Sequence, residues 1–224
     1  MSIEAVIFDM DGVLIDAKEW HYSALNRALA LFGYTIDHEA HLERFDGLPT
    51  KTKLEMLSQE LNLPRSLHRF INRMKQHYTN EIIAESLKPN HDHVYATWRL
   101  RMEGLKLAVA SNSIRATVEF MIRKAELTKY FEYLLSNEDV VDPKPSPLIY
   151  ERAMDLLGVN PENTLIVEDS PFGLQAAYAS GAHVLQVASI HEVNYRNIRE
   201  RMEEIEAELN PVPAYESSVF RRAA

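Results

Sequence analysis

Two aspartates spaced by one residue follow a short apolar run near the start of the chain. Residues 5–8 read Ala-Val-Ile-Phe, which is typical of a buried parallel strand, and Asp9 and Asp11 come directly after it. Side chains two positions apart in extended backbone point the same way, so both carboxylates can face one small volume. Crowded carboxylates repel each other, and a divalent cation is the usual remedy. The pair therefore indicates a cation site, although many such pairs are only turn residues or helix caps.

Polar residues follow two later apolar runs in the same way, namely Ser111-Asn112 after residues 105–110 and Glu168-Asp169-Ser170 after residues 164–167. Lys144 lies between them in the sequence, in a loop that holds Pro143, Pro145 and Pro147. In an open α/β sheet, ligands bind at the carboxyl ends of the strands, and parallel strands share that edge. Residues far apart in the sequence are therefore expected to converge on one site.

The elements that must position these residues alternate between strands and helices from residue 92 onward. Apolar runs bounded by turn residues alternate with segments in which apolar residues recur at helical spacing. The expected strands are residues 5–8, 105–110, 133–135, 164–167 and 182–187. This order predicts an α/β fold, a doubly wound parallel sheet with helices on both faces. A charged helix is expected at about residues 191–209, followed by an irregular tail after Pro211 and Pro213.

Residues 17–87 interrupt this pattern, because they contain helical periodicity and no strand candidate. Thr50 is expected to cap one of these helices. The chain is therefore predicted to hold an α/β catalytic core, residues 1–16 and 88–224, and an inserted α-helical cap domain, residues 17–87.

Composition excludes several classes of function. The 224 residues are 46% hydrophobic and 25% charged, as in an ordinary soluble globular protein. The net charge of −9 argues against a nucleic-acid partner, and the absence of cysteine excludes disulfides and thiolate chemistry. No apolar run suits a signal peptide or a membrane helix, so a cytoplasmic protein with no membrane partner is expected. The sequence does not separate a monomer from a small homo-oligomer.

Four motifs occur in one order: Asp9-Met10-Asp11-Gly12-Val13, Ser111-Asn112, Lys144-Pro145 and Glu168-Asp169-Ser170. Together they resemble the haloacid dehalogenase superfamily, and their spacing resembles its subfamily of phosphoglycolate-phosphatase-like and β-phosphoglucomutase-like members. The resemblance extends from Val6 to about Val187 and implies a Rossmann-like core with a cap.

The resemblance also implies a role for each motif. Asp9 would be the nucleophile that forms an aspartyl-phosphate, and Asp11 would protonate the leaving oxygen and later accept a proton from water. Mg²⁺ would be held by the Asp9 carboxylate, the Asp11 main-chain carbonyl, Asp169 and Glu168, the last as a ligand or a neighbour of the ligands. Ser111, Asn112 and Lys144 would hold the phosphoryl group.

Each of these roles has a simpler alternative. Ser111 or Ser170 can be a helix cap, Lys144 can be an exposed loop lysine, and Glu168-Asp169 can be a capping pair. His21 aligns with a histidine that mutase-like members place near the second aspartate, but it can equally be a packed residue.

The second aspartate argues against dehalogenase-like members, which need no proton for the leaving group, and leaves a phosphatase or a phosphomutase. Gly47 falls where mutase-like members have the cap specificity loop, whose arginine holds the second phosphate of the substrate. This chain has Leu48-Pro49-Thr50-Lys51 there instead. Lys51 can partly replace that arginine, and Arg115 keeps the charge expected after Ser111. We therefore expect a phosphatase that acts on a small phosphorylated metabolite, for example a sugar phosphate. The alternatives are a β-phosphoglucomutase-like isomerase and a non-catalytic module, which the intact acids disfavour.

Overall fold

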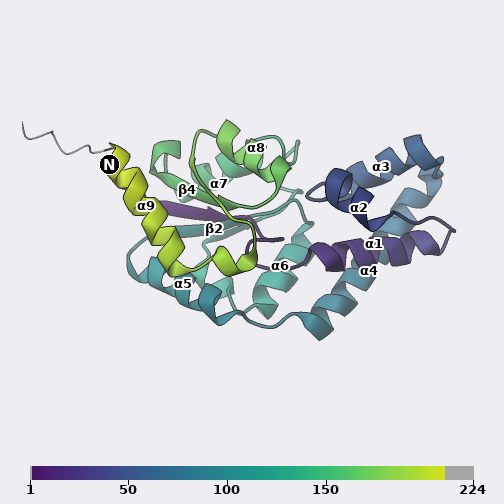
Figure 1. Cartoon of the computed structure of the whole chain (residues 1–224), viewed down its shortest axis with the longest axis horizontal. Coiled ribbons are helices and arrows are strands. Elements are labelled where there is room, and N and C mark those ends of the chain that lie inside the picture. Colours follow the sequence, from purple (N-terminus) through teal and green to yellow (C-terminus); the bar gives the residue numbers. More distant parts are fainter. Residues whose placement is uncertain (1, 210–224) are drawn as a thin grey trace, which may run out of the picture.

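A five-stranded parallel sheet forms the centre of the computed structural model, which describes residues 2–209 (Figure 1). The strand order is β3-β2-β1-β4-β5, and every neighbouring pair is parallel. The strands are β1 (Ala5–Phe8), β2 (Lys106–Ala110), β3 (Tyr133–Leu135), β4 (Thr164–Glu168) and β5 (His183–Gln186). The order reverses at β1, because β2 and β3 lie on one side of it and β4 and β5 on the other. The predicted doubly wound α/β fold is confirmed.

Side chains of β1 alternate between two buried layers. Val6 and Phe8 belong to one hydrophobic cluster, and Ala5 and Ile7 belong to the other. The first cluster includes residues of α5 (His91–Met102), α6 (Arg115–Lys124) and α9 (Tyr195–Leu209). The second includes residues of α7 (Leu148–Leu157) and α8 (Pro171–Ala179), which cover the opposite face (Figure 1). All four residues of β1 are buried, as expected for a strand covered by helices on both faces.

The segment between β1 and α5 is helical, as the sequence predicts. It contains α1 (Lys18–Ala30), α2 (His38–Ala40), a π-helical turn (His41–Phe45), α3 (Thr50–Leu61) and α4 (His68–Ser86). These helices enclose a separate hydrophobic cluster, to which Leu25, Phe45, Leu54 and Ile71 contribute, and they extend to one side of the sheet (Figure 1). We propose that they form the predicted cap; the boundaries at residues 16/17 and 87/88 stay a prediction.

Two details differ from the sequence-based expectation. Thr50 does not cap α3 but is its first residue, because Pro49 supplies the extended conformation that precedes the helix. The last helix begins at Tyr195, after a 3₁₀ turn at Ile190–Glu192. Further 3₁₀ turns lie at Arg65–Leu67, Thr128–Tyr130 and Pro161–Asn163. The expected tail after Pro211 lies outside the described residues. Within residues 2–209, no helix has the length and apolar character needed to cross a membrane.

Candidate active site

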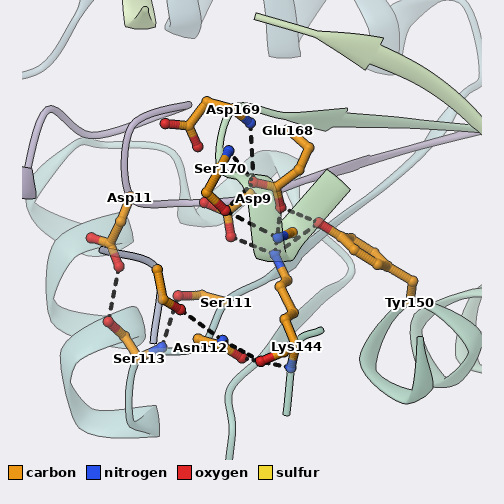
Figure 2. Close-up of polar contacts among 12 residues, drawn as sticks. Asp9, Asp11, Ser111, Asn112, Ser113, Lys144, Tyr150, Glu168, Asp169 and Ser170 are labelled. Carbon is orange, nitrogen blue, oxygen red and sulfur yellow. Dashed lines mark hydrogen bonds and ion pairs between the residues drawn. The ribbon is translucent and has the colours of Figure 1, made fainter. Parts of the chain in front are cut away.

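Three strand ends meet at the carboxyl edge of the sheet, as expected from the sequence. Asp9 directly follows β1, and its N–H donates to Val167 O of β4 at 3.0 Å. Glu168 ends β4, and Ser111 directly follows β2. The order of the strands reverses here, which is where open α/β sheets bind ligands. Figure 2 shows the Asp9 and Glu168 side chains beside the Lys144 ammonium group, with Ser111 farther from it.

Lys144 is the buried cation of the site. Its side chain is only 3% exposed, so it is not an exposed loop lysine. Its Nζ lies 2.6 Å from Asp9 Oδ1 and 2.8 Å from Glu168 Oε2, and it donates to the Tyr150 hydroxyl at 2.7 Å (Figure 2). Burial alone would lower the pKa of Lys144, but the two carboxylates outweigh it and raise that pKa. Lys144 therefore stays charged.

Glu168 is held in one position by hydrogen bonds from every side. Its Oε1 accepts from the N–H groups of Asp169 and Ser170 and from Ser170 Oγ, each at 3.0 Å, and Tyr150 donates to Oε2 at 2.6 Å. Burial favours a higher pKa for Glu168, but Lys144 and these donors lower it below the usual range. Ser170 Oγ also accepts from Gly173 N at 3.1 Å and so caps α8. Ser170 is therefore a helix N-cap, the simpler of the two roles considered for it from the sequence.

A candidate metal site lies next to this network. Carboxylate oxygens of Asp9, Glu168 and Asp169 lie within 4.8 Å of one another. Both oxygens of Asp169 are buried, and neither accepts a hydrogen bond of good geometry within the described residues. The Lys18 ammonium forms an ion pair with Asp169 Oδ2 at 2.7 Å. An all-oxygen set with unsatisfied carboxylate oxygens suits Mg²⁺, so the residues present fit the implied metal.

The electrostatics of these acids suit the binding of a cation. Burial and repulsion from Glu168 raise the pKa of Asp9 well above its usual value, although Lys144 opposes both. Burial raises the pKa of Asp169 to about 6, against the opposing effect of Lys18. A dication bound among them would favour the ionised form of each carboxylate.

Asp11 points its carboxylate away from the three clustered acids. Its Oδ2 accepts from Ser113 Oγ at 2.9 Å, and its Oδ1 lies 2.9 Å from His21 Nε2. His21 Nδ1 lies 3.1 Å from Lys75 Nζ. Because an ammonium group can only donate, Nδ1 accepts and the Nε2–H donates to Asp11. Burial favours a higher pKa for Asp11, but His21, Ser113 and Lys75 together lower it. For the metal, the predicted donor of Asp11 is its main-chain carbonyl, not this carboxylate.

The side chains of Asn112 and Ser111 form hydrogen bonds within the protein. Asn112 Nδ2 donates to the carbonyl oxygens of Gly47 and Lys144, and its Oδ1 accepts from Lys144 N. A phosphoryl contact from Asn112 would therefore use its main-chain N–H. Ser111 Oγ accepts from Ser113 N at 3.0 Å and still lines the cavity described below.

A cavity of about 610 Å³ lies between the strand ends and the helical segment, a size that suits a small ligand. The expected residues Gly47, Thr50 and Lys51 line it. Gly47 has φ +74°, and its carbonyl accepts from Asn112, so it joins the helical segment to the sheet edge. Arg115 is not among the lining residues, because its guanidinium pairs with Asp139 and Glu119 instead.

Sequence analysis missed several residues around the cavity. Lys51 is exposed, whereas Lys53, two positions later, is buried in the wall, as is Lys75 of α4. Lys18 and Tyr150 were also missed, and both contact the site acids. The spacing of lysines in α3 contains no signal for burial, since the rotation of the helix decides which of them faces inward. Ser113 could have been predicted as a site residue, because it extends the polar stretch that follows β2.

A family model for haloacid dehalogenase-like hydrolases matches residues 6–187. The chain belongs to this family, which confirms the resemblance seen in its four motifs. It is therefore an enzyme of this hydrolase family, and the acids and the lysine of the four motifs lie together at the carboxyl edge of the sheet.

Relatives of the chain carry more specific names. A phosphorylated carbohydrates phosphatase from Thermotoga maritima is 31% identical over 192 residues, which cover 86% of this chain and 88% of that protein. Pyrophosphatase PpaX from Bacillus cereus is 27% identical, with 84% of each chain covered. The crystal structure of CbbY from Rhodobacter sphaeroides in complex with phosphate is 28% identical, covers 82% of this chain and 85% of its own, and has a TM-score of 0.73.

Proposed function

We propose that the protein is a Mg²⁺-dependent phosphatase that hydrolyses a small phosphorylated carbohydrate through an aspartyl-phosphate on Asp9. One observation carries the proposal: Asp9 contacts the buried Lys144 ammonium, lies in the three-acid cluster and faces the cavity together with Asp11. A phosphate monoester is a dianion, so a carboxylate can attack it only where cations offset the charge.

Asp9, Glu168 and Asp169, with the main-chain carbonyl of Asp11, would hold the metal. When bound, Mg²⁺ supplies positive charge to the phosphoryl oxygens and to the attacking carboxylate. Lys144 supplies a second positive charge next to Asp9, and its contact with Glu168 fixes its position.

In the first step, an Asp9 oxygen forms a bond to phosphorus as the bond between phosphorus and the ester oxygen breaks. The leaving alkoxide takes its proton from Asp11. The resting site keeps Asp11 ionised, but an arriving phosphate dianion raises the pKa of a neighbouring carboxyl group and so favours its protonation. The hydrogen bonds from His21 and Ser113 hold the Asp11 side chain in place.

In the second step, water attacks the phosphorus of the aspartyl-phosphate. Asp11, now ionised, accepts a proton from this water as general base. The bond between phosphorus and the Asp9 oxygen breaks, which releases inorganic phosphate and restores the Asp9 carboxylate. The same residue therefore serves as acid and then as base.

The relatives guide the choice of substrate. The phosphorylated carbohydrates phosphatase supports a sugar phosphate, and the pyrophosphatase supports pyrophosphate as a competing substrate. A phosphomutase is the second candidate, favoured by the His21–Asp11 contact, because mutase-like members place a histidine near the second aspartate.

Turnover measurements test the proposal. Phosphate release from an aryl phosphate, glucose 6-phosphate and pyrophosphate should require Mg²⁺ and stop with EDTA. Conversion of β-glucose 1-phosphate to glucose 6-phosphate, measured in parallel, would indicate the mutase instead. Phosphate release that persists in EDTA, or no turnover of any of these substrates, would contradict the proposed function.

A further inference from the structure

One buried histidine of the α/β core takes no part in the proposed chemistry. His93 lies in the first turn of α5, is only 1% exposed, and is not among the residues that line the cavity. A buried polar side chain destabilises the fold unless it forms hydrogen bonds. The partners of His93 therefore show which part of the fold requires it.

Both ring nitrogens of His93 lie within hydrogen-bond distance of a main-chain carbonyl. Nδ1 lies 3.1 Å from Leu14 O, in the turn that follows Asp11, and Nε2 lies 2.8 Å from Ile190 O, in the 3₁₀ turn before α9. Carbonyl oxygens only accept, so only the doubly protonated ring could donate to both. Burial, the largest effect, lowers the pKa of His93, so at pH 7 we expect the neutral ring, which has one N–H.

Asn90 decides which ring nitrogen carries this hydrogen. Its Oδ1 accepts from Asp92 N at 2.9 Å and so caps α5, which leaves its Nδ2 to face His93 Nε2 at 3.4 Å. An amide nitrogen can only donate, so Nε2 accepts and the Nδ1–H donates to Leu14 O.

The two carbonyls differ in their need for a donor from His93. Ile190 O also accepts from Val193 N at 3.3 Å, whereas within residues 2–209 Leu14 O accepts only from His93. Because Leu14 is buried, its carbonyl depends on this one donor. His93 is therefore required by the turn that contains Leu14.

That turn also contains Asp11. Leu14 N and Ile15 N both donate to Met10 O, at 3.0 Å and 2.9 Å, and Gly12 N donates to Ile15 O at 2.7 Å, so the turn closes on itself. These internal hydrogen bonds fix the shape of the turn. The hydrogen bond at Leu14 O instead ties the turn to α5, and so fixes its place in the core.

We infer that His93 is a positioning residue for Asp11 and acts through the carbonyl of Leu14. The inference rests on the proposed function, in which Asp11 is the general acid and base. His21 and Ser113 orient the carboxylate, whereas His93 holds the main chain from which it extends. A small displacement of a proton donor slows the reaction without weakening substrate binding, so the effect should appear in kcat and not in KM.

Three substitutions separate the two contacts of His93. Asparagine places an amide N–H near the position of Nδ1, glutamine places one near that of Nε2, and leucine removes both. His93→Asn should therefore keep most of the activity. His93→Gln and His93→Leu should lower kcat by about tenfold for phenyl phosphate and glucose 6-phosphate, whose leaving groups need a proton. For 4-nitrophenyl phosphate, whose leaving group needs little protonation, the loss should stay below about twofold.

A matched control separates this effect from the loss of any histidine. His183 also contacts a main-chain carbonyl, Glu162 O at 3.2 Å, but it begins β5 and so lies at the opposite edge of the sheet from Asp11. His183→Leu should leave the ratio of the kcat values for phenyl and 4-nitrophenyl phosphate unchanged. Thermal unfolding checks that every variant is folded, and the two amide variants still test the inference if His93→Leu does not fold.

Hydrogen exchange gives a readout that needs no turnover. The main-chain N–H groups of Gly12, Leu14 and Ile15 should exchange about tenfold faster in His93→Gln and His93→Leu than in the wild type and His93→Asn, because the turn opens more often. Equal exchange in all of these proteins, or equal slowing of all esters, would overturn the inference alone. No turnover of any ester, or an Asp11→Asn variant that slows all esters equally, would count against the proposed function instead.

Discussion

At the scale of single residues, the site is organised by charge that the protein itself cannot fully balance. Lys144 lies between Asp9 and Glu168, yet the pKa of Asp9 remains raised by burial and by Glu168. Asp169 has two buried oxygens that accept no hydrogen bond of good geometry within residues 2–209, and only Oδ2 has an ion pair there, with Lys18. Buried charges without full compensation destabilise the free protein. They are useful at a site where a charged ligand supplies the compensating charge.

Asp9→Asn should abolish turnover, because an amide does not attack phosphorus. Loss of a covalent nucleophile costs several orders of magnitude in kcat. The melting temperature should stay the same or rise, since the change removes a carboxylate that burial and Glu168 disfavour. Phosphate release assays and thermal unfolding measure the two effects, and substantial remaining activity would rule out Asp9 as nucleophile.

Asp11→Asn should slow hydrolysis of alkyl phosphates by roughly 10²–10⁴-fold, the usual contribution of general acid–base catalysis. The loss should be smaller for aryl phosphates, whose leaving groups need little protonation. A series of esters with different leaving-group pKa values measures this dependence. Equal slowing for all of them would show that Asp11 has another role.

At the scale of elements, α8 begins so close to β4 that its third residue must be glycine. A Cβ added to Gly173 would overlap the carboxylate of Glu168. Helix propensity alone favours alanine over glycine by about 1 kcal/mol, so propensity and packing make opposite predictions.

We expect packing to decide. Gly173→Ala should destabilise the protein by about 1–3 kcal/mol, the usual cost of overpacking, and lower its melting temperature by several degrees. Turnover should also fall, since Glu168 and Asp169 would move. Thermal unfolding and phosphate release measure both effects, and a more stable, fully active variant would show that α8 shifts freely.

The strands and the residues that follow them were predictable from sequence because both signals are local. Ala5–Phe8 reads as a buried strand whatever surrounds it, and the parallel order then brings Asp9, Ser111 and Glu168 to one edge. Burial of Lys53 was not predictable, because it depends on how α3 is rotated against α4. Tyr150 was missed for the same reason, since it reaches Glu168 only through the packing of α7 on the sheet.

At the scale of the whole molecule, the site is divided between two sets of elements. The sheet edge supplies the acids and Lys144, whereas the helical segment supplies His21, Lys53 and Lys75. The contact between Gly47 O and Asn112 Nδ2 joins the two parts at 2.9 Å. Under the proposed function, both parts therefore contribute to phosphoryl transfer, since His21 of the helical segment positions Asp11.

Removal of divalent metal should inactivate the protein without unfolding it. Lys144 and Lys18 already offset part of the charge of the acids, so the fold does not depend on the metal alone. After EDTA treatment, activity should be lost and then restored by Mg²⁺, while the thermal unfolding transition remains cooperative. Unfolding in EDTA at room temperature would contradict this expectation.

The ion pair between Lys18 and Asp169 gives metal loading a particular character. An ammonium already stands where part of the positive charge is needed, and it also lies 3.5 Å from Asp46 at the edge of the helical segment. If Lys18 withdraws when a dication enters, loading is an ion exchange: one charge leaves, two arrive, and the site gains one rather than two. The displaced ammonium would then be free to strengthen its pairing with Asp46, so the concentration of divalent metal would affect an ion pair within the helical segment.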